Sequence, residues 1–223
     1  YIPRTFAAIV RIASVGRSLV AIEEGATGPD KDCGYEGVFL KAIAGIPISM
    51  EGKTAACAHL SPVGNVASAC ADLWSNESVQ NIKLLGGMAP TVYAEQLAYD
   101  CRLMNAAIAR GPETMLGLRD LLVESDVRHD PQALILAPAN VIRIVGRMVT
   151  AASHLEAAVL GCLEGLDVIE AAVDTGELAI DDRERIWIDM LRNDIDSIPR
   201  VEGEFVDQML PSIDPGRCLL EEY

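Results

Sequence analysis

Two short apolar segments, separated by one stretch of helical character, constrain the fold of this chain more than any other feature. Leu19–Glu23 and Ile46–Met50 have the continuous apolar character of parallel strands that are buried on both faces. Gly34–Ala44 lies between them and is predicted to be the helix of a strand–helix–strand crossover. Two parallel strands cannot form a stable sheet alone, since both faces and both edges need cover. The sequence therefore predicts the later part of a larger α/β protein.

A loop that is dense in polar groups follows each predicted strand. Asp30–Cys33 follows the first strand, and Glu51–Thr54 follows the second. Functional residues of parallel α/β folds gather in the loops at the carboxyl ends of the strands. We therefore expect Cys33 and the segment Glu51–His59 to face the same crevice.

The rest of the chain is predicted to be helical. Pro3–Ser14 has helical spacing, and Gly16 is expected to end this first helix. From Pro90 to Arg110 the apolar residues form one stripe, made of Tyr93, Leu97, Cys101, Met104 and Ile108. Further helix starts are predicted from capping signals at Asp130, Ser153 and Asp181.

Composition narrows the class of protein. The net charge is −15 with only 18 Lys and Arg residues, which argues against nucleic acid as a partner because phosphate binding needs a basic face. No apolar run reaches the roughly 18 residues of a membrane span, and no charged-then-apolar leader opens the chain. We therefore expect a cytoplasmic protein with no membrane partner, and six scattered cysteines in the reduced state. The chain starts at Tyr1 directly in helix-like sequence, as the middle of a protein does.

The two polar loops hold the residues with the clearest chemistry, and each has two interpretations. Cys33 is either a thiolate metal ligand or nucleophile, or a buried structural cysteine. Cys57 and His59 could share one metal only in a loop, because residues two apart on a helix point away from each other; otherwise they are a packing cysteine and a surface histidine. Glu51 and Lys53 are either acid–base groups or an ion pair.

The remaining histidines and cysteines are interpreted as structural. His129 is expected to be a solvated loop residue, and His154 a residue of the first turn of a helix. Cys101 and Cys162 lie on helical stripes and Cys218 lies near the carboxyl terminus, so all three are predicted to pack.

Five strings, in this order along the chain, carry a family resemblance: KDCGYEG (Lys31–Gly37), MEGKTAACAH (Met50–His59), LWSNESV (Leu73–Val79), LAYDCRLMN (Leu97–Asn105) and DPQA (Asp130–Ala133). By these strings the chain resembles the zinc-containing methanol:corrinoid methyltransferases over nearly its whole length. Members of this family move the methyl group of methanol onto the cobalt of a partner corrinoid protein.

The resemblance implies an α/β fold, the C-terminal portion of a TIM (β/α)8 barrel followed by a mainly helical region. The chain itself would be helix-dominated with about two parallel strands. Residues 1–85 would form the last βα units with the active-site loops. Residues 86–223 would form the helical region, which packs on the barrel and on partners.

The resemblance also implies a zinc ion held by a glutamate and two cysteines from barrel loops. The second cysteine matches Cys33, whereas the glutamate and the first cysteine belong to motifs upstream of this chain. The pocket candidates near this ligand are Asp32, Tyr35, Glu51 and Lys53.

The function implied by the resemblance is part of a zinc-dependent methyltransferase of methanogenesis or methanol utilisation. Methanol is then the substrate, a corrinoid (cobalamin) is carried by the partner protein, and the chain is expected to be a homo-oligomer. Alone it is expected to be inactive, because two zinc ligands are missing. One alternative is a non-catalytic truncated remnant that serves as a helical partner-binding or dimerisation module. Another is an unrelated metallohydrolase that uses Cys57 and His59.

Overall fold

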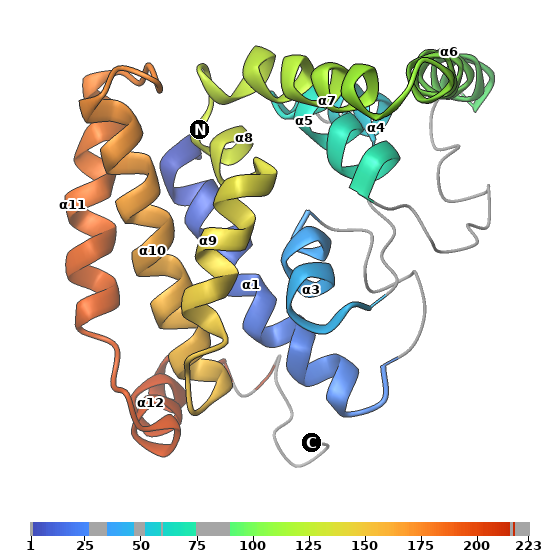
Figure 1. Cartoon of the computed structure of the whole chain (residues 1–223). Helices are drawn as coiled ribbons and strands as arrows, with labels where there is room; N and C mark the ends of the chain where they lie inside the picture. The colour runs from blue at the N-terminus through green and yellow to red at the C-terminus, as the bar shows by residue number, and fades with distance from the viewer. Residues whose placement is uncertain are drawn as a thin grey trace.

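The computed structural model describes residues 2–26, 35–46, 52–58, 60–74, 90–214 and 216, and every regular element within these ranges is helical (Figure 1). The longer helices are α1 (Arg4–Glu23), α6 (Pro90–Ala109), α7 (Pro112–Val127), α9 (Pro138–Met148), α10 (His154–Asp174) and α11 (Asp182–Asp196). The shorter ones are α3 (Gly37–Ala44), α4 (Lys53–Ala58), α5 (Gly64–Ser68), α8 (Pro131–Leu136) and α12 (Glu202–Met209). A π-helical turn follows α5 and a 3-10 turn follows α12: η1 (Ala69–Trp74) and η2 (Leu210–Ser212).

The expected barrel portion with two parallel strands is wrong for the described residues. Leu19–Glu23 forms the last turns of α1 and is not a strand. Gly16 does not end the helix: a Cβ there would lie 3.2 Å from the carbonyl oxygen of His154. This glycine therefore serves close packing against α10, which overrides its low helix propensity. Of the second predicted strand, Ile46 lies outside any regular element and residues 47–50 lie outside the described ranges.

Continuation through Gly16 makes α1 longer than the sequence pattern predicted. Among the described helices, α1 alone is long and apolar enough, by length and composition, to cross a membrane. Of its apolar stretch 39% is buried inside the bundle, and a core helix passes the same test. One side of α1, with Ile12 and Val15, is buried in the bundle as in a core helix.

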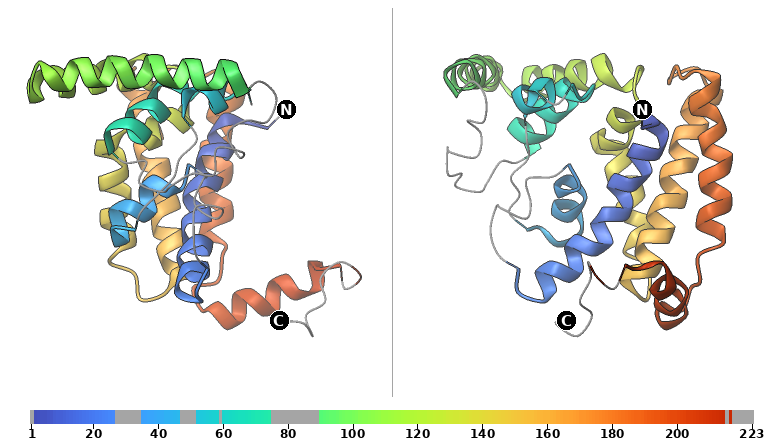
Figure 2. Two further views of the ribbon diagram at one scale, coloured as in Figure 1. Left: turned by 90° about the vertical axis from the view of Figure 1, so that its right-hand side faces the viewer. Right: turned by 180° about the vertical axis from the view of Figure 1, so that it is seen from behind.

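Much of the core lies between α1 and the helices α9, α10 and α11, which stand side by side in Figure 1 with α1 behind them, and the same core includes buried residues of α3, α5 and α8. The view from behind in Figure 2 shows α1 crossing in front of this group. Ile12 at the middle of α1 is fully buried. A Cβ at Gly161 would lie 3.1 Å from Ile12 Cγ2, and one at Gly165 would overlap Ile12 Cδ1. These two glycines of α10 therefore make the space that Ile12 fills.

A second group of helices, α4 to α7, lies at one end of the bundle (Figure 1). Asp126 of α7 connects to α5, since its Oδ2 accepts hydrogen bonds from the backbone nitrogens of Asn65 at 2.7 Å and Val66 at 2.9 Å. The left view of Figure 2 shows α6 lengthwise at the edge of the molecule. The division of the chain at residue 85 stays a prediction.

Local capping predictions are confirmed at three helix starts. In each, a side-chain oxygen accepts a hydrogen bond from a backbone nitrogen two or three positions later, which satisfies one of the free N–H groups of the first turn. The pairs are Asp130 with Gln132 at 2.7 Å, Ser153 with Glu156 at 3.1 Å and Asp181 with Glu184 at 2.9 Å.

The predicted apolar stripe of α6 is only partly buried. Met104 is buried, as is Ala107 one turn along, but Ile108 is 54% exposed and Cys101 is exposed as well. The prediction that Cys101 packs in the core is therefore wrong. α6 lies at the edge of the molecule, so only one narrow side of it meets neighbouring helices.

Candidate functional site

The sequence-predicted site divides between described and undescribed parts of the chain. Asp32, Cys33, Glu51 and His59 lie outside the described residues, as does Cys218. Tyr35 and Lys53 are described: Tyr35 follows the first predicted loop, and Lys53, predicted to lie in the second loop, is the first residue of α4.

Tyr35 is packed against α1 and is not open to solvent. The residue is only 7% exposed, and the guanidinium carbon of Arg11 lies 4.4 Å from the ring centroid. Arg11 also donates from Nε to Oε1 of Gln132 at 2.9 Å. A cation over an aromatic face, half enclosed by protein, is attractive by about 1 kcal/mol. The contact joins the start of α3 to α1 and α8.

Lys53 forms an ion pair with Asp100, whereas the two interpretations of Glu51 and Lys53, acid–base groups or an ion pair, both stay predictions. Its Nζ lies 2.9 Å from Oδ1 of Asp100 on α6, and both side chains are largely buried, 25% and 13% exposed. Asp100 thereby joins the start of α4 to α6. Glu51, the other candidate of this loop, lies two positions before Lys53 and outside the described residues.

These contacts bring the family strings together in pairs. Arg11 connects Tyr35 of KDCGYEG with Gln132 of DPQA, and the ion pair connects Lys53 of MEGKTAACAH with Asp100 of LAYDCRLMN. Strings that are far apart in the sequence are thus neighbours in the fold. The partners Arg11 and Asp100 were not predicted as site residues. For Asp100 a signal existed, because it lies inside one of the five strings.

The four described cysteines fall into two classes. Cys70 and Cys162 are buried, their Sγ atoms lie 3.3 Å from the carbonyl oxygen of Leu136 and 3.7 Å from that of Ile9, and burial raises the pKa of both thiols to about 12. Such thiols stay protonated and inert at neutral pH. The packing interpretation of Cys162 is confirmed. Cys57 on α4 is exposed, so the packing interpretation of that residue is wrong.

Both described histidines lie where the sequence placed them. His129 is exposed in the turn before α8, and its carbonyl oxygen accepts from Nη1 of Arg4 at 3.2 Å. His154 is the first residue of α10, and its Nε2 lies 2.8 Å from Oε2 of Glu23. No group of three or more His, Cys, Asp or Glu in the described ranges could hold a metal ion.

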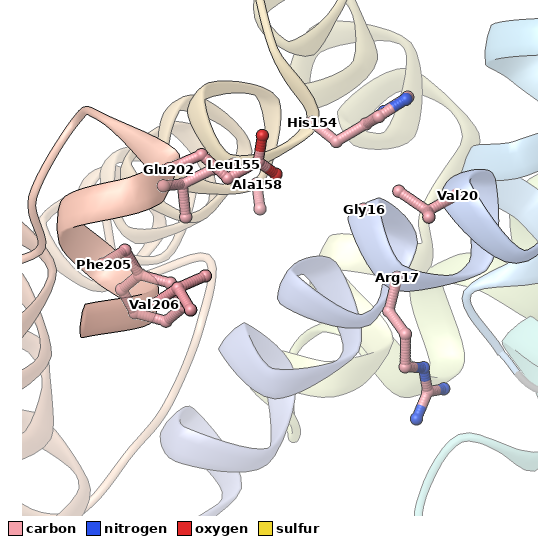
Figure 3. A pocket seen from close by; sticks show the side chains of 9 residues that line it. All are labelled: Gly16, Arg17, Val20, His154, Leu155, Ala158, Glu202, Phe205 and Val206. Carbon is pink, nitrogen blue, oxygen red and sulfur yellow. The ribbon is translucent and has the colours of Figure 1, made fainter. Parts of the chain in front are cut away.

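An open pocket of about 260 Å³ lies at the carboxyl-terminal half of α1, between α1, the start of α10 and α12 (Figure 3). Its lining is mainly apolar, with three ionisable side chains: Gly16, Arg17, Val20, His154, Leu155, Ala158, Glu202, Phe205 and Val206. Tyr35 and Lys53 do not line it. This pocket is therefore distinct from the described parts of the predicted site.

Comparison with known proteins places the chain in a family. A family model described as methanol-cobalamin methyltransferase B subunit matches residues 1–216. The chain belongs to this family. The resemblance inferred from the five strings is confirmed.

Two relatives give the extent of the similarity. The methanol–corrinoid protein co-methyltransferase of Methanosarcina barkeri (strain Fusaro / DSM 804) is 50% identical over 140 residues, which are 63% of this chain and 30% of that protein. The crystal structure of the methanol:cobalamin methyltransferase complex MtaBC from Methanosarcina barkeri contains a chain that matches with a TM-score of 0.78 and 36% identity. That match covers 96% of this chain and 48% of the solved one. The present member of the methanol-cobalamin methyltransferase B family thus spans less than half the length of either relative.

Proposed function

We propose that this chain is part of a zinc-dependent methyltransferase that transfers the methyl group of methanol to the cobalt of a corrinoid protein, in methanol utilisation and methanogenesis. The observation that carries the proposal is the match of the methanol-cobalamin methyltransferase B model over residues 1–216. The names of the two relatives support methanol as substrate and a corrinoid protein as partner.

The proposed chemistry needs help at the leaving group. Methanol is a poor electrophile because hydroxide leaves poorly, and a zinc Lewis acid supplies stabilisation of the charge that develops on the departing oxygen. By resemblance to the family, Cys33 is the ligand that this chain contributes, as a thiolate. The other ligands would come from the portion of the family fold that this chain does not span.

The described residues contribute by positioning the loops. Tyr35 lies two positions after Cys33, and its contact with Arg11 fixes where that loop enters α3. Lys53 lies two positions after Glu51, and its ion pair with Asp100 fixes where the second loop enters α4. In the proposed enzyme, an anchored residue two positions from Cys33 or Glu51 would reduce the entropy lost when those side chains are oriented for reaction.

The net charge of −15 bears on the partner in this proposal. An acidic surface favours a corrinoid protein with a basic rim, and such contacts speed encounter more than they add affinity. Association should then slow as salt rises, with a smaller change in the dissociation rate. A homo-oligomeric state and a cytoplasmic location belong to the same proposal.

A helical partner-binding module is the second candidate function, and the surface of α6 and α7 favours it. No residue of α7 is buried, and large apolar side chains of both helices face solvent: Tyr99 (60% exposed), Leu103 (51%), Leu116 (41%) and Leu121 (66%). A chain that binds the corrinoid protein without supporting turnover would fit this candidate.

The test of this proposal measures two quantities on the same protein samples: the zinc content per chain and the rate of methyl transfer. The 223-residue chain, purified and dialysed, should hold well under one zinc per chain, because one thiolate cannot replace three ligands. In a polypeptide that joins this chain to the rest of the family fold, Cys33→Ala should abolish both zinc and the conversion of cob(I)alamin to methylcobalamin by methanol. Cys162→Ala is the control and should keep both, at a cost to stability on the order of 1 kcal/mol.

Two results would contradict the assignment. Full zinc and full turnover in Cys33→Ala would remove Cys33 from the site. One tightly held zinc in the isolated 223-residue chain would show that Cys57 or His59 contributes a ligand.

A further inference from the structure

One side of α1 faces solvent although it is almost entirely apolar. The residues Phe6, Val10, Ala13, Arg17 and Val20 recur at steps of three and four along the helix, and all five are exposed. We name them the α1 stripe. It runs roughly 21 Å along the helix at 1.5 Å per residue, and Arg17 is its only charged member. The Arg17 side chain lies 3.6 Å from Glu36.

Apolar residues of other helices continue the α1 stripe at both ends. At one end the ring of Phe6 meets the ring of Trp187 on α11 edge to face, with centroids 5.7 Å apart. Met190, one turn along α11 from Trp187, is 44% exposed. At the other end Arg17 and Val20 line the open pocket with Phe205 and Val206 of α12, as Figure 3 shows. A continuous apolar surface of this extent is typical of an interface.

We propose that the α1 stripe, with its extensions on α11 and α12, is the surface on which the remaining part of the family fold packs. The match with the solved relative covers 96% of this chain but only 48% of the relative's chain. About half of the relative's polypeptide therefore has no counterpart in this chain. That polypeptide has to pack on the matched part, and a helix buried on one side and apolar on the other suits it. The inference rests on the family membership and not on the proposed activity.

Two other occupants fit the observations less well. A second copy of this chain at this surface would bring together two molecules that each carry a net charge of −15, which opposes pairing there; the proposed homo-oligomer would use another surface. Contact with a membrane would require one of two arrangements. Either α1 leaves the bundle, or α1 stays in the bundle and only the α1 stripe enters the lipid. Ala8, Ile9, Ile12 and Val15 are buried on the opposite side, so leaving the bundle would expose the core.

The first test is a binding experiment with the intact 223-residue chain. The probe is the part of the Methanosarcina barkeri methyltransferase that this chain does not match, co-expressed as a separate, tagged polypeptide. Capture of the chain through the tag is expected. Val10→Glu in the α1 stripe should lower capture by about tenfold or more, because it buries an unpaired charge in the interface. Ile142→Glu on α9, a change at an exposed apolar position outside both the α1 stripe and the surface of α6 and α7, should leave capture unchanged.

The second test does not require the probe to fold alone. The probe and this chain are joined in one polypeptide in the order of the relatives. Maleimide labelling of Val10→Cys and Ile142→Cys is then compared in the joined polypeptide and in the 223-residue chain. Labelling at position 10 should be about tenfold slower in the joined polypeptide, because the stripe is covered, and labelling at position 142 should be equal in both. The unsubstituted chain supplies the background from its native thiols.

Three results would overturn the proposal. Equal labelling at position 10 in the two polypeptides would show that the α1 stripe is not covered. A dimer of the 223-residue chain in sedimentation, lost in Val10→Glu, would assign the stripe to a second copy. Flotation of the chain with phosphatidylcholine vesicles, lost in the same variant, would assign it to a membrane.

Discussion

The carboxylate of Glu184 lies 2.9 Å from the backbone nitrogen of Thr5, 179 positions earlier in the chain. Its other oxygen accepts a hydrogen bond from the backbone nitrogen of Arg4, also at 2.9 Å. α1 has no side-chain cap of its own at Pro3, so two of its free N–H groups are satisfied by α11. The start of the central helix is therefore held by a long-range contact and not by local sequence.

Removal of this cap should destabilise the whole bundle. Glu184→Ala leaves two N–H groups without their acceptor in a buried place and should lower the free energy of unfolding by about 1–3 kcal/mol. Glu202→Ala is the control, because Glu202 is exposed in the first turn of α12; it should stay within about 0.5 kcal/mol. Urea unfolding followed by circular dichroism measures both. Equal stability of the two variants would show that the long-range cap contributes nothing.

Two glycines provide a matched pair for the packing of α1 on α10. Gly165→Ala should destabilise by about 1–3 kcal/mol, because the new Cβ overlaps Ile12 Cδ1 in the core. Gly146→Ala on the exposed side of α9 meets nothing within 4 Å and should stabilise by up to about 1 kcal/mol through helix propensity. Thermal unfolding of both variants tests the pair. Stabilisation by Gly165→Ala would mean that α1 and α10 do not approach as closely as described.

Asp130 should make stability depend on pH. Burial raises the pKa of this carboxyl above its ordinary value of 3.8, against the lowering effects of the Gln132 backbone hydrogen bond and of Arg4. The folded chain then binds the proton more tightly than the unfolded chain. The contribution to stability is therefore complete below pH 3.8 and is lost as the pH rises through the folded pKa.

The variant Asp130→Asn isolates this effect, since its amide oxygen can still accept from Gln132 while the proton equilibrium is gone. The unfolding free energy of the parent chain should fall relative to that of Asp130→Asn as the pH rises above 3.8. Urea unfolding at a series of pH values measures the difference. A difference that is constant, or that grows in favour of the parent chain, would contradict the burial of a charged group at this site.

The ion pair between Lys53 and Asp100 should show measurable coupling. Both partners are less than one-third exposed, so a double-mutant cycle with Lys53→Met and Asp100→Asn should give a coupling energy of about 1 kcal/mol. The exposed pair Arg200 and Asp196, at 3.8 Å, is the control and should give almost none. A cycle without coupling at Lys53 would mean that α4 is not held to α6 by this contact.

Thiol reactivity should separate the described cysteines. Cys57 and Cys101 are exposed, whereas burial raises the pKa of Cys70 and Cys162 to about 12. Maleimide at pH 8 should therefore modify the first two at least about tenfold faster in the folded chain. Peptide mass spectrometry after timed quenching measures each site, and unfolding in guanidinium should remove the difference. Fast modification of Cys162 in the folded chain would show that the contact between α1 and α10 opens.

The parts of the fold that were predictable from sequence are those decided within one turn of helix. Asp130, Ser153 and Asp181 each carry a side chain that can reach a backbone nitrogen two or three positions later, so the helix starts follow from local geometry. The prediction of a strand at Leu19–Glu23 was wrong because the outcome depends on a distant part of the chain. Whether Gly16 ends a helix or faces another one depends on α10, which lies more than a hundred residues away.

The site shows the same limit. The two loops were identified from their polar residues, and the choice for Lys53 between acid–base group and ion pair was left open. The partner that Lys53 does have, Asp100, lies 47 positions away. Arg11 similarly reaches Gln132 across 121 positions. No spacing rule predicts such pairs, because they depend on how separate helices pack.

Because α1 is synthesised long before α10, the buried side of α1 stays uncovered for part of the synthesis of the chain. A ribosome adds roughly 5–20 residues per second, so α1 is made roughly 10–40 s before the residue that caps it, 179 positions later. Through most of this interval Ile9, Ile12 and Val15 have no α10 to pack against. The nascent chain thus exposes a long apolar segment until α10 is made. A chain whose synthesis stops before α10 carries that helix uncovered, and such a product should aggregate or be degraded.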